Sequence, residues 1–297
     1  MSRLHFGAGL AVAMLLAGSL DAQLPDESVT AVVRKNRVPV NSDIPRVNLP
    51  RATETTLSNG LTVLLLEDHR IPRIAVTYLV AGAGPTHSPA ASPGLAGVVA
   101  QMLREGTMTR SRSAIDAELE RLGARLATGG AFGPEAASIT MTGLSDNFEQ
   151  WVAVAQDVVA NPTFPPEEVE RAKRLLKTLL VQQRSTSAFL ATERFTRALY
   201  GSHPAAEAAV TAATADALTS EQLTRWHRER YVPQRTIIGI AGDINVKDLL
   251  PKLEKWFGQW NAKGSTAASL PAVQRASQRK AWLIDRPGSV QTSFMIR

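Results

Sequence analysis

The sequence predicts an α+β fold built from layers of sheet and helix. Strand patterns come in adjacent pairs, separated from runs of helix patterns, and do not alternate singly with helices as in βαβ units. The chain has 297 residues, of which 44% are apolar and 20% charged, so it is long enough for one or two globular domains.

The first strand pair is expected after residue 55. Asn59-Gly60 is a strong hairpin signal, and it precedes an apolar strand at residues 61–66. A second turn at residues 69–72 leads into a β-branched strand at residues 74–80. These strands should form part of the core sheet.

Two helices and two strands follow. Ser92 as N-cap and Pro93 at the first helical position predict a helix that ends at Gly106. A second helix is expected from Ser111 or Ser113 to Gly123. Strands are expected at residues 125–129 and 136–142.

The next part of the chain is mostly helical. A helix capped by Ser145 or Asp146 has apolar residues at 3/4 spacing, and a long helix opens at Pro165-Pro166. The long helix carries the apolar stripe Val169, Ala172, Leu176 and Leu179. Helices at residues 188–200 and 220–230, a strand at 236–241 and a final amphipathic helix near 249–257 complete a unit at residues 55–260.

Both ends of the chain have a different character. Residues 1–22 are typical of a secretory signal, with a basic start and a short apolar run, although an uncleaved anchor is the alternative. Residues 23–54 read as a proline-containing linker or strap, and residues 261–278 as a second linker. Strands predicted at 281–285 and 291–296 suggest that residues 279–297 begin a second, truncated domain. No later stretch predicts a membrane span.

Several kinds of chemistry are disfavoured. The absence of cysteine excludes disulfides and thiolate sites. Gly82-Ala83-Gly84 lacks the third glycine of a dinucleotide motif, because position 87 is histidine. The five histidines form no spaced pair and are interpreted as surface or turn residues. The net charge of +6 is mild, and no run of basic residues is interleaved with aromatic residues. Nucleic-acid binding is therefore not expected.

Seven short motifs, in the right order, resemble the insulinase/mitochondrial processing peptidase family, the pitrilysin-type metallopeptidases. They are Leu57-Ser58-Asn59-Gly60-Leu61-Thr62-Val63, Gly94-Leu95-Ala96 with Met102-Leu103-Arg104-Glu105-Gly106-Thr107, Leu122-Gly123-Ala124, Asn161-Pro162-Thr163-Phe164, His203-Pro204, Tyr231-Val232-Pro233 and Ala241-Gly242-Asp243. The resemblance implies a complete first half-domain and only the beginning of its homologous second half.

The resemblance also implies where the catalytic groups should be. Active members carry an inverted zinc motif, His-x-x-Glu-His, on one helix and a distal glutamate on a later helix. In this sequence the first His position is Gly97, the Glu position Ala100 and the second His position Gln101. The distal position is Lys177 or Thr178. None of these residues replaces the lost group, so no bound zinc is expected.

The resemblance implies a non-catalytic subunit, and the predicted secretory signal places it in the periplasm or outside the cell. It would pair with a zinc-bearing homologous peptidase and hold an extended peptide by β-augmentation at an edge near Ala127, Thr128, Gly129 and Gly130. A plain strand-end turn is the simpler interpretation of those glycines. The alternatives are an active zinc metalloendopeptidase and a stand-alone peptide-binding or envelope module.

Overall fold

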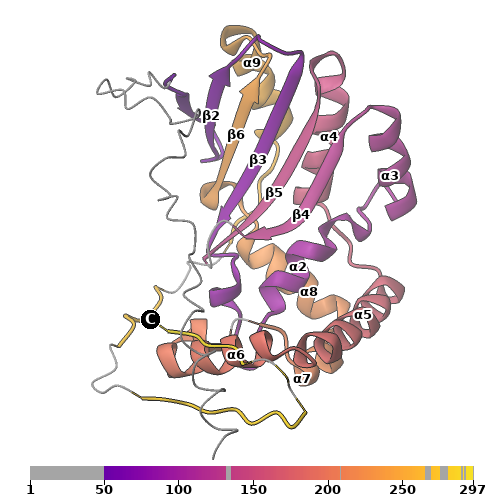
Figure 1. Ribbon diagram of the computed structural model, residues 1–297. Coiled ribbons are helices and arrows are strands. Elements are labelled where there is room, and N and C mark those ends of the chain that lie inside the picture. The colour runs from indigo at the N-terminus through magenta and orange to yellow at the C-terminus, as the bar shows by residue number, and fades with distance from the viewer. Residues whose placement is uncertain are drawn as a thin grey trace, which may run out of the picture. The chain divides into compact units, whose positions relative to one another are not determined.

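The computed structural model describes residues 50–131, 135–207, 209–264, 269–274, 280–288, 290 and 292–296 (Figure 1). The predicted signal segment and most of the first predicted linker lie outside these residues. No helix in the described ranges is both long and apolar enough to cross a membrane.

One six-stranded sheet organises the described residues, and it confirms the α+β prediction. Its spatial order is β1-β2-β6-β3-β5-β4. All neighbouring pairs are antiparallel except β2–β6, which is parallel. The strands are β1 Thr53–Thr56, β2 Thr62–Glu67, β3 Arg73–Ala81, β4 Arg125–Ala131, β5 Ala136–Leu144 and β6 Thr236–Gly242.

The predicted Asn-Gly turn joins β1 and β2 as a hairpin. The Asn59 side-chain oxygen accepts a hydrogen bond from the Leu61 amide at 3.1 Å, which closes the turn. The Asn59 amide nitrogen donates to the carbonyl oxygens of Phe257 (2.8 Å) and Trp260 (3.1 Å). The same residue therefore shapes the turn and fastens it to the end of the last helix.

The strands before and after the second predicted turn, β2 and β3, are not neighbours. Instead β6 lies between them, with Val63 opposite Ile238 and Tyr78 opposite the same residue on the other side. The central part of the sheet thus combines segments from both ends of the folded unit.

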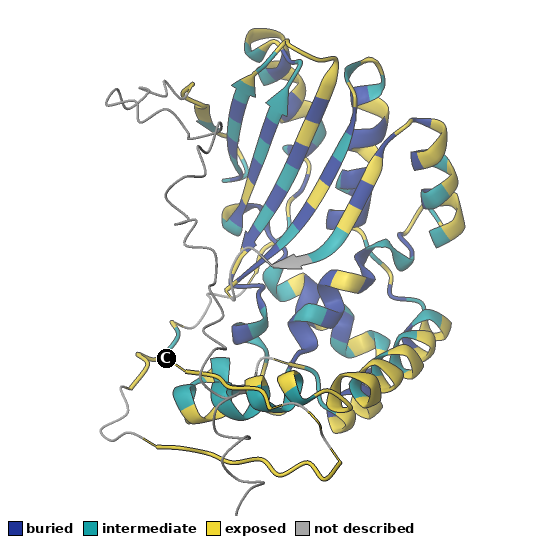
Figure 2. Ribbon diagram, viewed as in Figure 1, coloured by how far each residue is buried: buried dark blue, intermediate teal, exposed yellow. Residues whose placement is uncertain are grey.

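Helices cover one face of the sheet. Along β3, Ile74, Val76, Tyr78 and Val80 are buried, whereas the first residue of the strand, Arg73, is exposed. The alternating colours of the strands in Figure 2 show this two-sided character. Burial of alternate residues is the pattern of a sheet with one packed and one open face.

The helices and short 3₁₀ segments complete the architecture. The α-helices are α2 Leu95–Met102, α3 Arg112–Arg121, α4 Phe148–Ala160, α5 Pro166–Arg184, α6 Ser187–Tyr200, α7 Ala212–Ala217, α8 Ser220–Arg230 and α9 Val246–Phe257. The 3₁₀ segments are η2 Pro85–His87, η3 Leu103–Glu105, η4 Ser145–Asn147, η5 Pro204–Glu207 and η6 Pro233–Arg235. Ser111 caps α3 as predicted, since its hydroxyl accepts from the Ala114 amide at 3.3 Å.

The main core lies between the sheet and α2, α4, α8 and α9. Trp151 of α4 is fully buried, and its ring packs edge-on against that of Phe148 with the ring centroids 4.9 Å apart. Its indole N–H donates to the Leu144 carbonyl at 3.0 Å. In contrast, Val169 is the single buried residue of α5, and α6 has none. The predicted stripe of α5 is therefore only partly packed: Ala172 and Leu176 are half-buried against the core, and Leu179 is 40% exposed.

Four local predictions were wrong. Neither Ser145 nor Asp146 caps α4: both lie in η4, and α4 begins at Phe148 after Asn147. The helix predicted from Pro93 begins at Leu95, with Gly94 as N-cap in the left-handed region at φ +79°. A Cβ at Gly94 would lie 2.4 Å from the Val210 amide nitrogen, so only glycine allows this close approach.

The strands predicted at 281–285 and 291–296 are not strands within the described residues. Finally, His227 is neither a surface nor a turn residue: it lies buried within α8.

Candidate functional site

The first three motif positions lie on α2, where they present no metal-binding group. Gly97 and Gln101 are four residues apart and therefore share one side of the helix. Gln101 is exposed, Gly97 is half-buried, and nothing lies within 4 Å of the space that a Cβ on Gly97 would fill. Ala100 is 2% exposed and contributes only a methyl group to the core.

The distal positions on α5 are occupied by other interactions. The Lys177 ammonium forms an ion pair with Asp216 of α7. The Thr178 hydroxyl donates to the Arg174 carbonyl one turn earlier, at 3.1 Å. Helix α5 packs chiefly against α6 and α7, so these two residues belong to the outer helices.

Zinc does not fit this set of residues. Protein zinc ligands are His, Cys, Asp and Glu, and a motif helix needs two of them on one face. The four positions offer glycine, alanine, a neutral amide and either an ammonium or a hydroxyl. Over the whole described part of the chain, no group of three or more such ligands could hold a metal ion.

The predicted peptide edge lies directly against α2. Strand β4 is an edge strand of the sheet, and the Thr128 hydroxyl donates to the Gln101 carbonyl at 3.2 Å. Gly129 has φ +83°, and a Cβ there would lie 2.6 Å from Cγ of Gln101. The structure thus brings the second His position and the predicted edge into contact, with glycine required at the point of closest approach.

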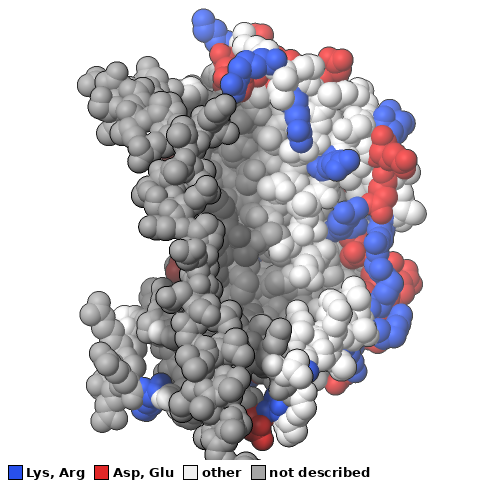
Figure 3. Space-filling view, in the orientation of Figure 1, with Lys and Arg blue, Asp and Glu red and all other residues white. Residues whose placement is uncertain are grey.

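The edge itself is irregular but accessible. The pairing of β4 with β5 shifts register between Ala127 and Gly130, which is a bulge-like interruption. Ala127 is exposed, and the Leu126 carbonyl accepts from Nη1 of Arg104 at 3.3 Å. Figure 3 shows few charged side chains over the visible face of β4 and β5, whereas acidic and basic groups gather along α3 at the rim.

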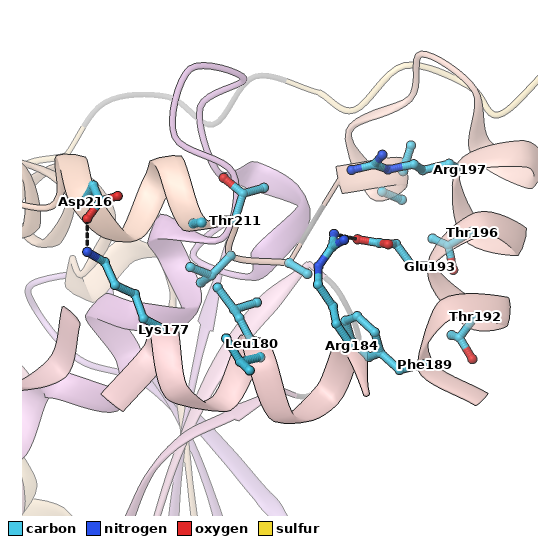
Figure 4. Close-up of a pocket in the computed structure, with 16 residues that line it drawn as sticks. Lys177, Leu180, Arg184, Phe189, Thr192, Glu193, Thr196, Arg197, Thr211 and Asp216 are labelled. Carbon is cyan, nitrogen blue, oxygen red and sulfur yellow. Dashed lines mark hydrogen bonds and ion pairs between the residues drawn. The ribbon is translucent and has the colours of Figure 1, made fainter. Parts of the chain in front are cut away.

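A pocket of about 590 Å³ opens between α5, α6 and the segment that leads into α7 (Figure 4). Lys177 and Asp216 lie at one end, and Phe189 of α6 lies at the other. No pattern in the sequence predicted this pocket. The only available signal was that α5 and α6 are amphipathic, which is also the pattern of helices that pack on a core.

Two histidines have polar partners of the kind found in catalytic sites, but neither arrangement is suited to catalysis. Asp243 accepts from Ser145 Oγ at 2.9 Å and lies 2.7 Å from Nδ1 of His69; its hydrogen bond to His69 raises the pKa of the imidazole. A serine nucleophile needs the imidazole between serine and carboxylate, whereas here the carboxylate is in the middle.

The second is His227, whose Nε2 lies 2.8 Å from the Val159 carbonyl and whose ring stacks on Tyr231. Burial lowers its pKa to about 4, so it is a neutral core residue near pH 7.

Sequence profiles of two families match this chain. The profile described as "Insulinase (Peptidase family M16)" matches residues 62–212, and that described as "Peptidase M16 inactive domain" matches residues 217–296. The chain belongs to the insulinase family. The join between the two matches, from residue 212 to residue 217, falls within α7, yet β6 pairs with β2 and β3. Both profiles therefore contribute strands to one sheet of this insulinase-family chain.

Curated relatives agree with this assignment. The chain is 27% identical over 212 residues to a probable mitochondrial-processing peptidase subunit beta of Schizosaccharomyces pombe, covering 71% of this chain and 46% of the relative. It is 23% identical over 211 residues to an uncharacterised zinc protease of Bacillus subtilis, covering 70% and 50%. The chain thus spans about half the length of these relatives.

Solved structures show the same fold. A peptidase M16 inactive domain from Pseudomonas fluorescens superposes with a TM-score of 0.70 at 25% identity, covering 76% of this chain and 54% of that one. The periplasmic protease PqqL from Escherichia coli gives a TM-score of 0.65 at 17% identity, covering 77% and 26%. The insulinase-family chain therefore has a zinc-protease-like fold.

Proposed function

We propose that this chain is a non-catalytic member of the insulinase family that holds an extended polypeptide along β4 and supports proteolysis by a zinc-bearing homologue. One observation carries the proposal. The sheet and α2 are intact, but the motif positions Gly97, Ala100 and Gln101 carry no group that can bind zinc or activate water.

Loss of the whole motif is a stronger argument than loss of one group. Zinc hydrolysis needs the metal, a generated hydroxide and a base, and each depends on different residues of the motif. Lys177, one of the two candidate distal positions, carries a positive charge that Asp216 already balances. Restoring activity would therefore require several simultaneous substitutions.

Peptide holding needs only the part of the site that remains. An exposed strand edge can pair with an extended chain through main-chain hydrogen bonds, which place little demand on sequence. Strand β4 offers such an edge, flanked by a mostly uncharged face. The bulge between Ala127 and Gly130 limits the edge to a short stretch, which discourages uncontrolled pairing.

The partner and the location rest on the relatives and on the N-terminal sequence. One curated relative is named as a subunit beta, and one structural neighbour is a periplasmic protease. The apolar run in residues 1–22 fits an exported chain. We therefore place the protein in the periplasm or outside the cell, beside an active homologue.

The test combines metal content, activity and binding. The purified full chain should contain far less than one zinc per chain and should not cleave a fluorogenic extended peptide. Adding it to a zinc-bearing homologue should raise that homologue's peptidase activity. The matched control for binding is the same peptide with N-methylated main-chain amides, which should bind at least about tenfold more weakly because edge pairing is blocked.

Each alternative predicts a different result. An active endopeptidase would contain about one zinc per chain and lose activity on chelation. A stand-alone peptide-binding module would bind the unmethylated peptide but leave the activity of every homologue unchanged. Either result would overturn the subunit proposal.

A further inference from the structure

The pocket between α5 and α6 has an apolar interior that the residues described by the structure leave unfilled. Leu180, Phe189 and Val210 line it and are half-buried, whereas Val181 at its margin is 74% exposed. Its volume of about 590 Å³ lies within the range of about 300–1,000 Å³ that is usual for ligand sites. The remaining small residues of the wall are alanines, which leave room for a bulky group (Figure 4).

Charged groups around the pocket are matched within the protein. Lys177 pairs with Asp216, and Nη2 of Arg184 lies 2.7 Å from Oε1 of Glu193. Figure 4 shows the first pair at one end and the second pair facing the interior. A ligand that brought its own charge would have to displace one of these pairs.

Two of the three threonine hydroxyl groups in the wall are also engaged, and Thr196 carries the third. The Thr192 hydroxyl donates to the Ala188 carbonyl at 2.8 Å, and the Thr211 hydroxyl lies 3.0 Å from that of Thr214. What these side chains leave for a ligand is apolar surface. Binding there would gain from apolar burial rather than from new ionic contacts.

The described C-terminal residues do not fill this face of α6. Trp282 stacks under the guanidinium of Arg194 at 3.8 Å, and Ser293 lies 3.0 Å from Ser187. At 100° per residue, Ser187 and Arg194 lie on the side of the helix opposite Phe189. Helix α6 thus contacts the C-terminal residues on one side and the open pocket on the other.

We propose that this pocket receives a large, uncharged apolar side chain of a bound polypeptide. The inference rests on the peptide-holding function proposed above and specifies its ligand: extended chains with an aromatic or large aliphatic anchor residue. A fatty acid or phospholipid would need a free cation for its anionic group, but Lys177 and Arg184 are paired and the third cation of the wall, Arg197, is also engaged. An apolar anchor in a preformed pocket is a common source of binding energy in peptide recognition.

The experiment uses the full chain and two blocked, uncharged Ser/Thr decapeptides that differ only in a central Phe or Ser. The Phe peptide should bind about tenfold more tightly, because a buried aromatic side chain contributes more than a hydroxyl that stays in water. Val181→Asp in the pocket should remove this difference. Leu175→Asp, on the same helix but outside the pocket and 56% exposed, should keep it. Thermal unfolding of both variants checks that they fold.

Three results would overturn the inference. The two peptides could bind with equal affinity, or Val181→Asp and Leu175→Asp could reduce the preference for the Phe peptide equally. The third is that decanoate binds, Val181→Asp abolishes that binding, and the Phe peptide is not preferred. The last result would assign the pocket to a lipid. In another possible result, the Ser peptide binds, N-methylation of its main chain abolishes that binding, and the Phe peptide binds no more tightly. Peptide holding on β4 would then stand, and the pocket assignment would fail. A Phe preference lost in Val181→Asp but insensitive to N-methylation would keep the pocket and refute the β4 edge.

Discussion

The core beneath the sheet and the outer layer of α5, α6 and α7 are built from similar amphipathic helices, but they are packed very differently. Helix α4 buries Trp151 completely against the sheet, whereas α6 has no buried residue and the far half of α5 exposes Leu175 and Leu179. The core fixes the fold, and the outer layer keeps apolar surface available. The difference suggests that binding specificity can change in the outer layer at little cost in stability.

The same contrast bears on the proposed replacement of the zinc-binding side chains on α2. Gly97 and Gln101 are on the less buried side of α2, so their side chains contribute little to the core. The buried residues of that helix, including Val98 and Val99, still pack beneath the sheet. The proposed loss of the catalytic groups is therefore compatible with an intact scaffold.

The largest expected effect is in the core. Trp151→Ala should lower the free energy of unfolding by about 3–5 kcal/mol, because it leaves a large cavity. Leu175→Ala on the outer layer should change it by less than about 0.5 kcal/mol, since that side chain is 56% exposed. Urea titration of both variants measures the two changes in the free energy of unfolding. If they are similar, the core and the outer layer do not differ in packing as described.

The next prediction compares polar contacts in the two regions. Oδ2 of Asp157 accepts from Thr107 (2.6 Å), Thr109 (2.7 Å) and Arg110 (2.8 Å), and the residue is buried. Asp157→Asn should cost about 1–3 kcal/mol, because an NH₂ group replaces one of the two accepting oxygens and a donor then faces a donor. Glu193→Gln, which breaks a pair in the outer layer, should cost no more than about 1 kcal/mol by the same titration. A larger cost for the outer variant would contradict the comparison.

The pH dependence of stability should also come from the core. Burial lowers the pKa of His227 from 6.5 to about 4, so the unfolded chain takes up this proton more readily. The contribution is fully present above pH 6.5 and is lost as the pH falls toward 4. Between pH 7 and pH 5 it should lower the free energy of unfolding by about 2 kcal/mol. In His227→Gln this part of the pH dependence should vanish; an unchanged pH profile would show that another group is responsible.

The smallest expected effect is a gain. Gly97→Ala should stabilise the protein by about 0.5–1 kcal/mol, because the position is helical and has open space for a methyl group. The matched variant Gly129→Ala should destabilise it, since that residue has φ +83° and would contact Gln101. Thermal unfolding of the pair would show whether the junction of α2 and β4 is as closely packed as the distances indicate.

Local patterns in the sequence were sufficient for most of the elements. The Asn59-Gly60 turn and the Ser111 cap form as predicted because their signals lie within a few residues. Helix α7, with the sequence Ala-Ala-Thr-Ala-Asp-Ala, was not specifically predicted because it has no apolar stripe. The position of β6 between β2 and β3 leaves no trace in any short window, since it depends on pairing between distant strands.

The candidate site, like the fold, was only partly predictable from the sequence. The emptied motif positions came from a resemblance in sequence, and the contact between Gly129 and Gln101 required the structure. The pocket was missed because an apolar stripe on a helix does not say what covers it. Periodicity identified the stripe of α5 but not the fact that Leu179 remains 40% exposed.

The insertion of β6 has a consequence for biosynthesis. Val63 of β2 pairs with Ile238 of β6, so the centre of the sheet cannot close until nearly all of residues 50–242 have left the ribosome. At about 5–20 residues per second, β2 waits for its neighbour on the order of ten seconds or more. During that interval the apolar strands β2 and β3 are available to chaperones and to other nascent chains, and the speed of translation becomes a determinant of yield.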